Sequence, residues 1–139
     1  MNYAHTVTVT ASFHDAVART RAALQEQGFG ILTEIDVRAT FDDKLGAESS
    51  QALGDYLILG ACNPALAQRA LSAEPDMGLL LPCNVVVRRG PDAAATTVQA
   101  INPQTMVELS SSADIEGVAD EADTRLLASL EVVKAEFTA

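Results

Sequence analysis

The chain has 139 residues, 48% of them hydrophobic, which is enough material for the core of one domain spanning residues 1–139. Nineteen acidic residues against nine basic ones leave a formal net charge of -10, so neither nucleic acid nor an anionic membrane surface is an expected partner. Aromatic residues make up only 4%, with no Trp, and few side chains are therefore suited to stacking on bases.

We expect the protein to be cytoplasmic. Its longest apolar stretch, residues 77–87, is about half the length of a membrane-spanning helix and is interrupted by Pro82 and Asn84. The N-terminal sequence MNYAHTVTVTASF alternates like a strand and lacks the basic start and apolar run of a signal peptide. The two cysteines are accordingly expected to be reduced thiols.

A strand, a helix and a second strand are predicted at the N-terminus. Apolar residues alternate with threonines across residues 3–11, a period of two that is typical of a half-buried strand. Ser12 followed by Asp15 resembles a capping box, and the helix that it starts should end near Gly28. Alternation over residues 31–38 predicts the second strand.

A single helical turn and a loop are predicted next. Thr40 and Asp43 have the spacing of a short helix cap, and Gly46 would end that turn. Residues 48–55 are polar and are expected to form a loop.

The centre of the chain contains a strand that runs directly into a helix. Residues 56–62 form a short apolar run typical of a buried strand. Asn63 is a good N-cap and Pro64 is favoured at the first helical position, so a helix should cover Pro64–Ala73 and stop before Pro75.

The last part of the chain predicts a hairpin and two helices. Residues 79–89 indicate a strand interrupted at Pro82, and residues 96–101 indicate its hairpin partner. A short helix is expected over residues 104–109. Asp114 should cap a final helix whose continuous apolar stripe would lie across the sheet.

Three segments together carry a family resemblance. ILTEIDVRATFDDKLG (residues 31–46), YLILGACNPALAQRAL (56–71) and LLLPCNVVV (79–87) resemble the domain-of-unknown-function family 302, DUF302, in an order that spans nearly the whole chain. The resemblance implies an α+β fold similar to the TATA-binding-protein-like class, in which a curved, mainly antiparallel sheet packs against helices in a β-α-β(4)-α order. It also implies a homodimer, and it implies no established activity.

Two positions depart from the family pattern. Members usually carry a basic residue after the tyrosine that precedes ILGACNP, where this chain has Leu57, and this speaks against a role for a cation there. Arg38 stands in place of the more usual lysine, which keeps the charge and changes the hydrogen-bond geometry.

Cys62 is the sharpest candidate for chemistry and the one candidate for a catalytic residue. It immediately precedes Asn63, so its thiol would lie near the positive end of the following helix, where a thiolate is stabilised. The alternative, which free cysteines more often represent, is a small buried hydrophobic residue at the end of a strand.

Cys83 shares the Cys-Asn dipeptide with Cys62, and the two sulfurs could meet if their strands are neighbours. Such a redox pair would lack C-x-x-C spacing, and disulfides are rare in the cytosol.

A metal site is not expected, because His5 and His14 are not at ligand spacing. Both histidines are interpreted as surface or strand-end residues.

Glu34, Asp36 and Arg38 should share one face of the second strand. The two carboxylates, two residues apart, could transfer protons if that face lined a cavity. The alternative is a solvated outer face on which Arg38 pairs with Asp36 or Glu34.

The sequence favours a binding module, since it contains none of the usual nucleophile, phosphate-binding or dinucleotide-binding motifs. We expect a small molecule or a partner to bind in a pocket between the sheet and the final helix, next to the motifs GACNP and LPCN. These motifs supply the expected binding residues Cys62, Asn63, Pro64, Cys83 and Asn84.

Two other functions stay open at this point. The chain could be a thiol-dependent redox or sulfur-handling protein that uses Cys62. It could also be a dimeric interaction scaffold, because the predicted hairpin of residues 85–101 would have edges that need a partner. The sequence indicates no particular cofactor.

Overall fold

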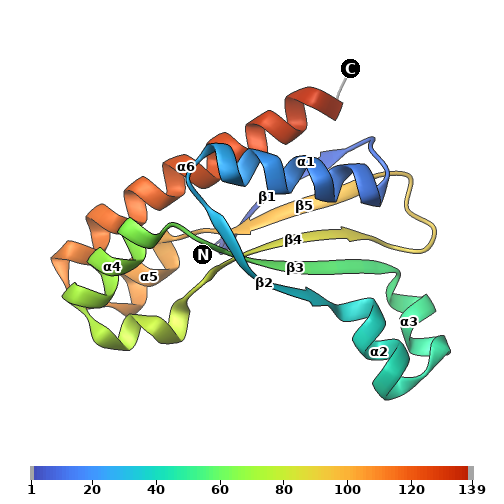
Figure 1. The fold of residues 1–139 in the computed structure, drawn as a ribbon, viewed down its shortest axis with the longest axis horizontal. Coiled ribbons are helices and arrows are strands. Elements are labelled where there is room, and N and C mark those ends of the chain that lie inside the picture. The colour runs from blue at the N-terminus through green and yellow to red at the C-terminus, as the bar shows by residue number, and fades with distance from the viewer. Residues whose placement is uncertain (1, 138–139) are drawn as a thin grey trace.

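Five strands form one antiparallel sheet in the order β1-β5-β4-β3-β2 (Figure 1). The computed structural model describes residues 2–137, so residues 1 and 138–139 of the expected domain lie outside the described part. The strands are β1 (Ala4–Val9), β2 (Gly30–Asp36), β3 (Asp55–Cys62), β4 (Cys83–Arg89) and β5 (Thr96–Ile101). The helices are α1 (Phe13–Glu26), α2 (Val37–Leu45), α3 (Ala47–Leu53), α4 (Pro64–Ala73), α5 (Gln104–Leu109) and α6 (Ala113–Phe137), with a 3-10 helix, η1, at Pro75–Leu80.

The expected α+β class is confirmed, and so is the order of the core elements. β1, α1, the four strands β2 to β5 and α6 follow one another as β-α-β(4)-α, with α2, α3, α4 and η1 inserted between strands and α5 between β5 and α6. The first helix begins as predicted, because the Oγ of Ser12 accepts a hydrogen bond from the amide of Asp15 at 3.1 Å.

Helices α1 and α6 cover the same face of the sheet (Figure 1). Val85 and Val98 point from the central strands into a core to which α6 contributes Leu126, Leu130 and Val133. The prediction that the final helix lies across the sheet is therefore confirmed. Although α6 has 25 residues, no helix within residues 2–137 is apolar enough over a sufficient length to cross a membrane.

A second buried cluster lies where α4, η1 and α5 pack against the N-terminal half of α6. Its central members are Leu66, Met77, Met106 and Ile115. Burial of each such side chain contributes about 1.5 to 3 kcal/mol to stability. This cluster fixes α4 at one end of the sheet.

The segment between β2 and β3 differs from its prediction. The second strand ends at Asp36, whose side chain accepts a hydrogen bond from the amide of Ala39 at 2.9 Å and caps α2. Gly46 ends α2 as expected, but the helix has nine residues, and residues 48–53 of the predicted loop belong to α3. α2 buries none of its side chains, so the apolar periodicity that signals a helix is weak there.

Two further boundaries were predicted wrongly. The strand expected over residues 79–89 begins only at Cys83, and residues 75–80 form η1 instead. Pro82 has no backbone N–H and cannot donate to a strand ladder, which is why the pairing starts after it. The final helix begins at Ala113, one residue before the predicted cap at Asp114.

The hairpin of β4 and β5 lies inside the sheet. β4 pairs with β3 and β5 pairs with β1, so neither strand of the hairpin is an edge. The exposed-edge reason for a dimeric scaffold is therefore wrong for this hairpin. The edge strands of the sheet are β1 and β2.

Gly54 should not tolerate a side chain. It joins α3 to β3 with a φ of +80°, and a Cβ atom there would lie 2.5 Å from the carbonyl oxygen of Arg89. Gly54→Ala should lower the free energy of unfolding by roughly 2 to 4 kcal/mol, measured by urea denaturation. Gly90→Ala is the control, because no atom lies within 4 Å of the added Cβ. Equal denaturation midpoints for the two variants would contradict the prediction.

Candidate functional site

A cavity of about 280 Å³ lies at the end of the sheet where β3 passes into α4. Its walls come from the adjoining ends of β2, β3 and β4, from α4, and from α5 and α6. Among its lining side chains, only Asn63 carries nitrogen or oxygen, and only Cys62, Cys83 and Met106 carry sulfur. The rest of the wall is hydrocarbon.

The junction of strand and helix places Cys62 and Asn63 on this wall. Cys62 is the last residue of β3 and is half-buried. The Oδ1 of Asn63 accepts a hydrogen bond from the amide of Leu66 at 3.2 Å, so Asn63 caps α4 as predicted. Pro64 opens the helix, but it is exposed and does not line the cavity.

Cys83, at the start of the neighbouring strand, also lines the cavity. Its exposed fraction is 8%. Burial, with a smaller contribution from nearby Cys62, raises the pKa of the Cys83 thiol to about 11. Near neutral pH this group is therefore a protonated thiol.

The two cysteines share the cavity without forming a disulfide. Both are free thiols. The register pairs Cys83 with Ala61, and successive residues of a strand point to opposite faces, so Cys62 is not the cross-strand neighbour of Cys83. Cysteines whose Cβ atoms point apart cannot be bridged without backbone movement. The structure thus brings together two thiols that are not a preformed redox pair.

Asn84 lies outside the cavity. It is exposed and follows Cys83 in β4, so it points to the other face of the sheet. There it lines a separate hollow with Tyr56 and Gln99. Cys83 and Asn84 of the LPCN motif therefore point to opposite faces of the sheet.

The charged candidates of β2 also lie outside the cavity. Glu34 forms an ion pair with Arg21 of α1 at 2.5 Å, and Asp36 caps α2. Arg38 pairs with Asp55 at 2.8 Å. The predicted pairing of Arg38 with Asp36 or Glu34 is wrong, because the strand ends at Asp36 and Arg38 belongs to α2.

Phe29, Leu32 and Met106 line the cavity but were not identified from the sequence. Phe29 is 3% exposed and stands between Gly30 and Gly28, the residue near which the sequence predicts the end of the first helix. Leu32 lies at an irregularity in the pairing of β2 with β3, and Met106 comes from α5. Only the position of Phe29 gave a local signal.

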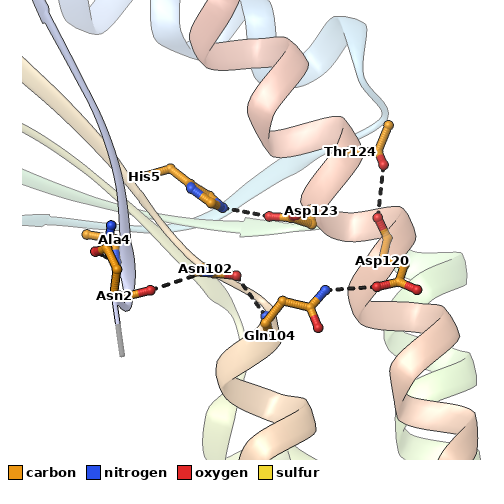
Figure 2. A network of polar contacts seen from close by, with 8 residues as sticks. All are labelled: Asn2, Ala4, His5, Asn102, Gln104, Asp120, Asp123 and Thr124. Atoms are coloured by element: carbon orange, nitrogen blue, oxygen red, sulfur yellow. Dashed lines mark hydrogen bonds and ion pairs between the residues drawn. The ribbon is translucent and has the colours of Figure 1, made fainter.

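The histidines lie away from the cavity wall. His5 Nε2 lies 2.6 Å from Asp123 Oδ1, and Gln104 donates to Asp120 at 2.8 Å, so β1 and α5 are both joined to α6 (Figure 2). His14 is exposed. Within residues 2–137, no group of three or more His, Cys, Asp or Glu side chains could hold a metal ion.

The fold and the cavity define an α+β domain with helices on one face of its sheet and an apolar cavity at one end. Residues 5–133 match the family described as "Domain of unknown function DUF302". The chain therefore belongs to this family, which confirms the resemblance of the three sequence motifs.

A solved structure supports the same assignment. The crystal structure of an uncharacterized conserved protein DUF302 from Bacillus stearothermophilus is similar to this chain, with a TM-score of 0.83 and 26% sequence identity. The similarity covers 95% of this chain and 98% of that one. No curated protein matches the chain.

The buried thiol of Cys83 should make stability depend on alkaline pH. Its pKa rises from 9.0 to about 11 on folding, so the folded state holds this proton more tightly. The stabilisation is complete below about pH 9 and is lost as the pH rises through about 11. Relative to Cys83→Ala, the wild-type free energy of unfolding should fall by about 2 to 3 kcal/mol over this interval. Urea denaturation at a series of pH values tests this, and a constant difference between the two proteins would contradict it.

Proposed function

We propose that the protein is a binding module for a small molecule whose apolar part occupies the cavity at Cys62, Asn63 and Cys83. The cavity itself is the observation that carries this proposal, since about 280 Å³ of space is walled mainly by hydrocarbon. Apolar cavities of about 150 Å³ stay dry and bind benzene. On that scale, this cavity would hold an apolar group of roughly ten heavy atoms.

The few polar groups of the wall favour a neutral ligand. Asn63 uses its Oδ1 to cap α4, so its amide Nδ2 is the donor left for a ligand. Among the described residues, no charged side chain lines the cavity. A buried ionic group would lack a partner there and would be costly to desolvate.

We also propose that this function is cytoplasmic and involves neither nucleic acid nor a membrane surface. The two free thiols suit a reducing compartment. The net charge of -10 disfavours contact with phosphate backbones and anionic lipids.

Filling the cavity should reduce ligand binding. Ala67 lines the cavity from α4, whereas Ala65 on the same helix is exposed. Neutral probes such as 1-octanol and 2-naphthol should raise the Tm of wild type and of Ala65→Leu. The shift for Ala67→Leu should be less than about half as large, because its added carbon atoms occupy the space.

The measurement is a thermal-shift titration, with circular dichroism to show that both variants are folded. The screen should also include metabolites, haem and thiols. The absence of any shift for wild type across this panel would contradict the proposed function.

A second candidate function is self-association, and we propose that the chain forms a homodimer through the open face of its sheet. The face opposite α1 and α6 is covered by neither of these two long helices, and α2 contacts the sheet at β3 (Figure 1). Alternation and register place sixteen strand residues on it: Ala4, Thr6, Thr8, Gly30, Thr33, Ile35, Tyr56, Ile58, Gly60, Cys62, Asn84, Val86, Arg88, Thr97, Gln99 and Ile101. None of the nineteen acidic residues of the chain is among them.

This charge distribution favours the open face over the rest of the surface. Two copies with a net charge of -10 repel each other wherever carboxylates meet. The open face carries one charged side chain, Arg88, whose Nε donates to Gln99 Oε1 at 3.2 Å. Ile58, Val86 and Ile101 add apolar area that is only partly buried in the single chain.

A carboxylate on the open face should weaken this dimer. Val86→Glu places a negative charge at the centre of the face, and the dissociation constant should rise at least about tenfold. Gln68→Glu on the exposed side of α4 adds the same charge elsewhere and is the matched control. Sedimentation equilibrium measures both, and a wild-type protein that stays monomeric at all practical concentrations would defeat the dimer proposal.

A further inference from the structure

Arg89 is a half-buried cation without an acidic partner. It is the last residue of β4, and its Nη1 donates to the carbonyl oxygen of Ala11 at 3.3 Å and to Thr96 Oγ1 at 3.0 Å. Within residues 2–137 it forms no ion pair, although the chain has nineteen acidic residues for nine basic ones. A guanidinium group held only by neutral acceptors keeps its full charge, and removing that charge from water without a counter-ion is costly.

The cross-strand neighbour of Arg89 is an acidic residue that pairs elsewhere. The register places Asp55 of β3 opposite Arg89 of β4. Asp55 Oδ1 instead accepts a hydrogen bond from Nη1 of Arg38, in α2, at 2.8 Å. One carboxylate thus stands beside two guanidinium groups and forms an ion pair with only one of them.

These three charged side chains line one hollow of about 290 Å³. It lies at the end of the sheet where β3 begins and β4 ends, next to α2 and α3, whereas α4 and α5 lie at the other end with the apolar cavity (Figure 1). Two guanidinium groups and one carboxylate give its lining a net charge of +1, in a chain with a formal net charge of -10. The remaining lining residues are Gln51, Gly54, Gly90 and Pro91.

Gly54 brings the end of α3 close to the end of β4. A Cβ atom at Gly54 would lie 2.5 Å from the carbonyl oxygen of Arg89, so the two backbones can approach this closely only because residue 54 has no side chain. Gln51, three residues earlier on α3, therefore lines the same hollow as Arg89.

The hollow has hydrogen-bond donors left for a ligand. Each guanidinium group has five N–H groups, and the described hydrogen bonds of Arg38 and Arg89 engage only the Nη1 of each. The side-chain amide of Gln51 makes no hydrogen bond within the described residues. Two adjacent N–H groups of a guanidinium fork match the two oxygens of a carboxylate.

We propose that this hollow binds the carboxylate group of a small organic acid between Arg38 and Arg89. The inference goes beyond the proposed function, because it uses neither the apolar cavity nor the open face of the sheet. One negative charge matches the net charge of the lining, and the volume limits the ligand to roughly ten heavy atoms. A dianion is disfavoured, because Asp55 is part of the lining and Asp36 and Asp42 line the adjoining hollow beside Arg38.

The experiment follows the arginine Nε–H signals of the full chain by NMR. Sodium pyruvate, benzoate or phosphate replaces sodium chloride at constant ionic strength and pH 7. Pyruvate and benzoate should shift the signals of Arg38 and Arg89 along a saturating curve, with a dissociation constant on the order of 1 mM. The Arg88 signal should stay in place, because Arg88 points to the opposite face of the sheet.

Three results would overturn the proposal. The first is that neither carboxylate produces a saturating shift. The second is that the signals of all arginines move together, because this would indicate general attraction of anions. The third is that phosphate binds more tightly than both carboxylates.

Matched variants test the two arginines. Arg89→Gln and Arg38→Gln should each raise the dissociation constant at least about tenfold, as the loss of a hydrogen bond between charged groups does. Lys44→Gln removes the same charge from an exposed position of α2 outside the hollow and should change the constant by less than about twofold.

The side-chain amide signal of Gln51, which all three variants retain, gives each dissociation constant, and circular dichroism shows that each variant is folded. If Arg89→Gln fails to fold, Arg38→Gln decides the result. Unchanged affinity in Arg38→Gln, or an equal loss in Lys44→Gln, would contradict the proposed site.

Discussion

The antiparallel pairing of β3 with β4 determines where a cavity can form. Ala61 lies opposite Cys83, so both strands end at the same level of the sheet. β3 leaves through Asn63 into α4, and β4 is entered from η1 through Pro82. Because neither strand continues past this level, α4 and η1 pack against α6 instead of against a sheet, and their small side chains leave space between them. The cavity lies between the region where helices pack on the sheet and the region where helices pack on one another.

Close packing around Gly60 fixes the position of Pro82, which lines the cavity. Gly60 pairs with Thr33 of β2 and with Asn84 of β4, and a side chain at residue 60 would collide with Thr33 Oγ1 and with the ring of Pro82. Pro82 is thereby seated over the sheet as it approaches the cavity wall. Thr33 is β-branched and has few alternative rotamers, so it cannot easily make room. Because Gly60 has no side chain, Pro82 can pack against it, next to the cavity wall that β2, β3 and β4 form.

The parts of the fold that could be predicted are those with a local physical cause. Asn63 followed by Pro64 signals the helix start and Pro75 signals its end, so the bounds Pro64–Ala73 follow from these local features. α2 was missed because it buries no side chain and leaves no apolar stripe. The cavity could be placed near GACNP and LPCN, but Leu32 and Met106 reach it only through a strand irregularity and a distant helix. Alternation could have shown that Cys83 and Asn84 face opposite ways, whereas the departure of Arg38 from the strand depends on where α2 begins.

The cavity and the open face of the sheet, for which we propose roles, adjoin each other at Pro82. This limits how binding at one can affect binding at the other. Pro82 lines the cavity and also packs over Gly60, which lies on the open face beside Thr33. A ligand in the cavity can change the affinity of the open face for a second chain only if it makes different contacts in the two states. The described contacts offer one such route, a displacement of Pro82 and Thr33. Helix α6 belongs to both buried clusters and lines the cavity through Val118 and Ala122, but it covers the face of the sheet opposite the open one.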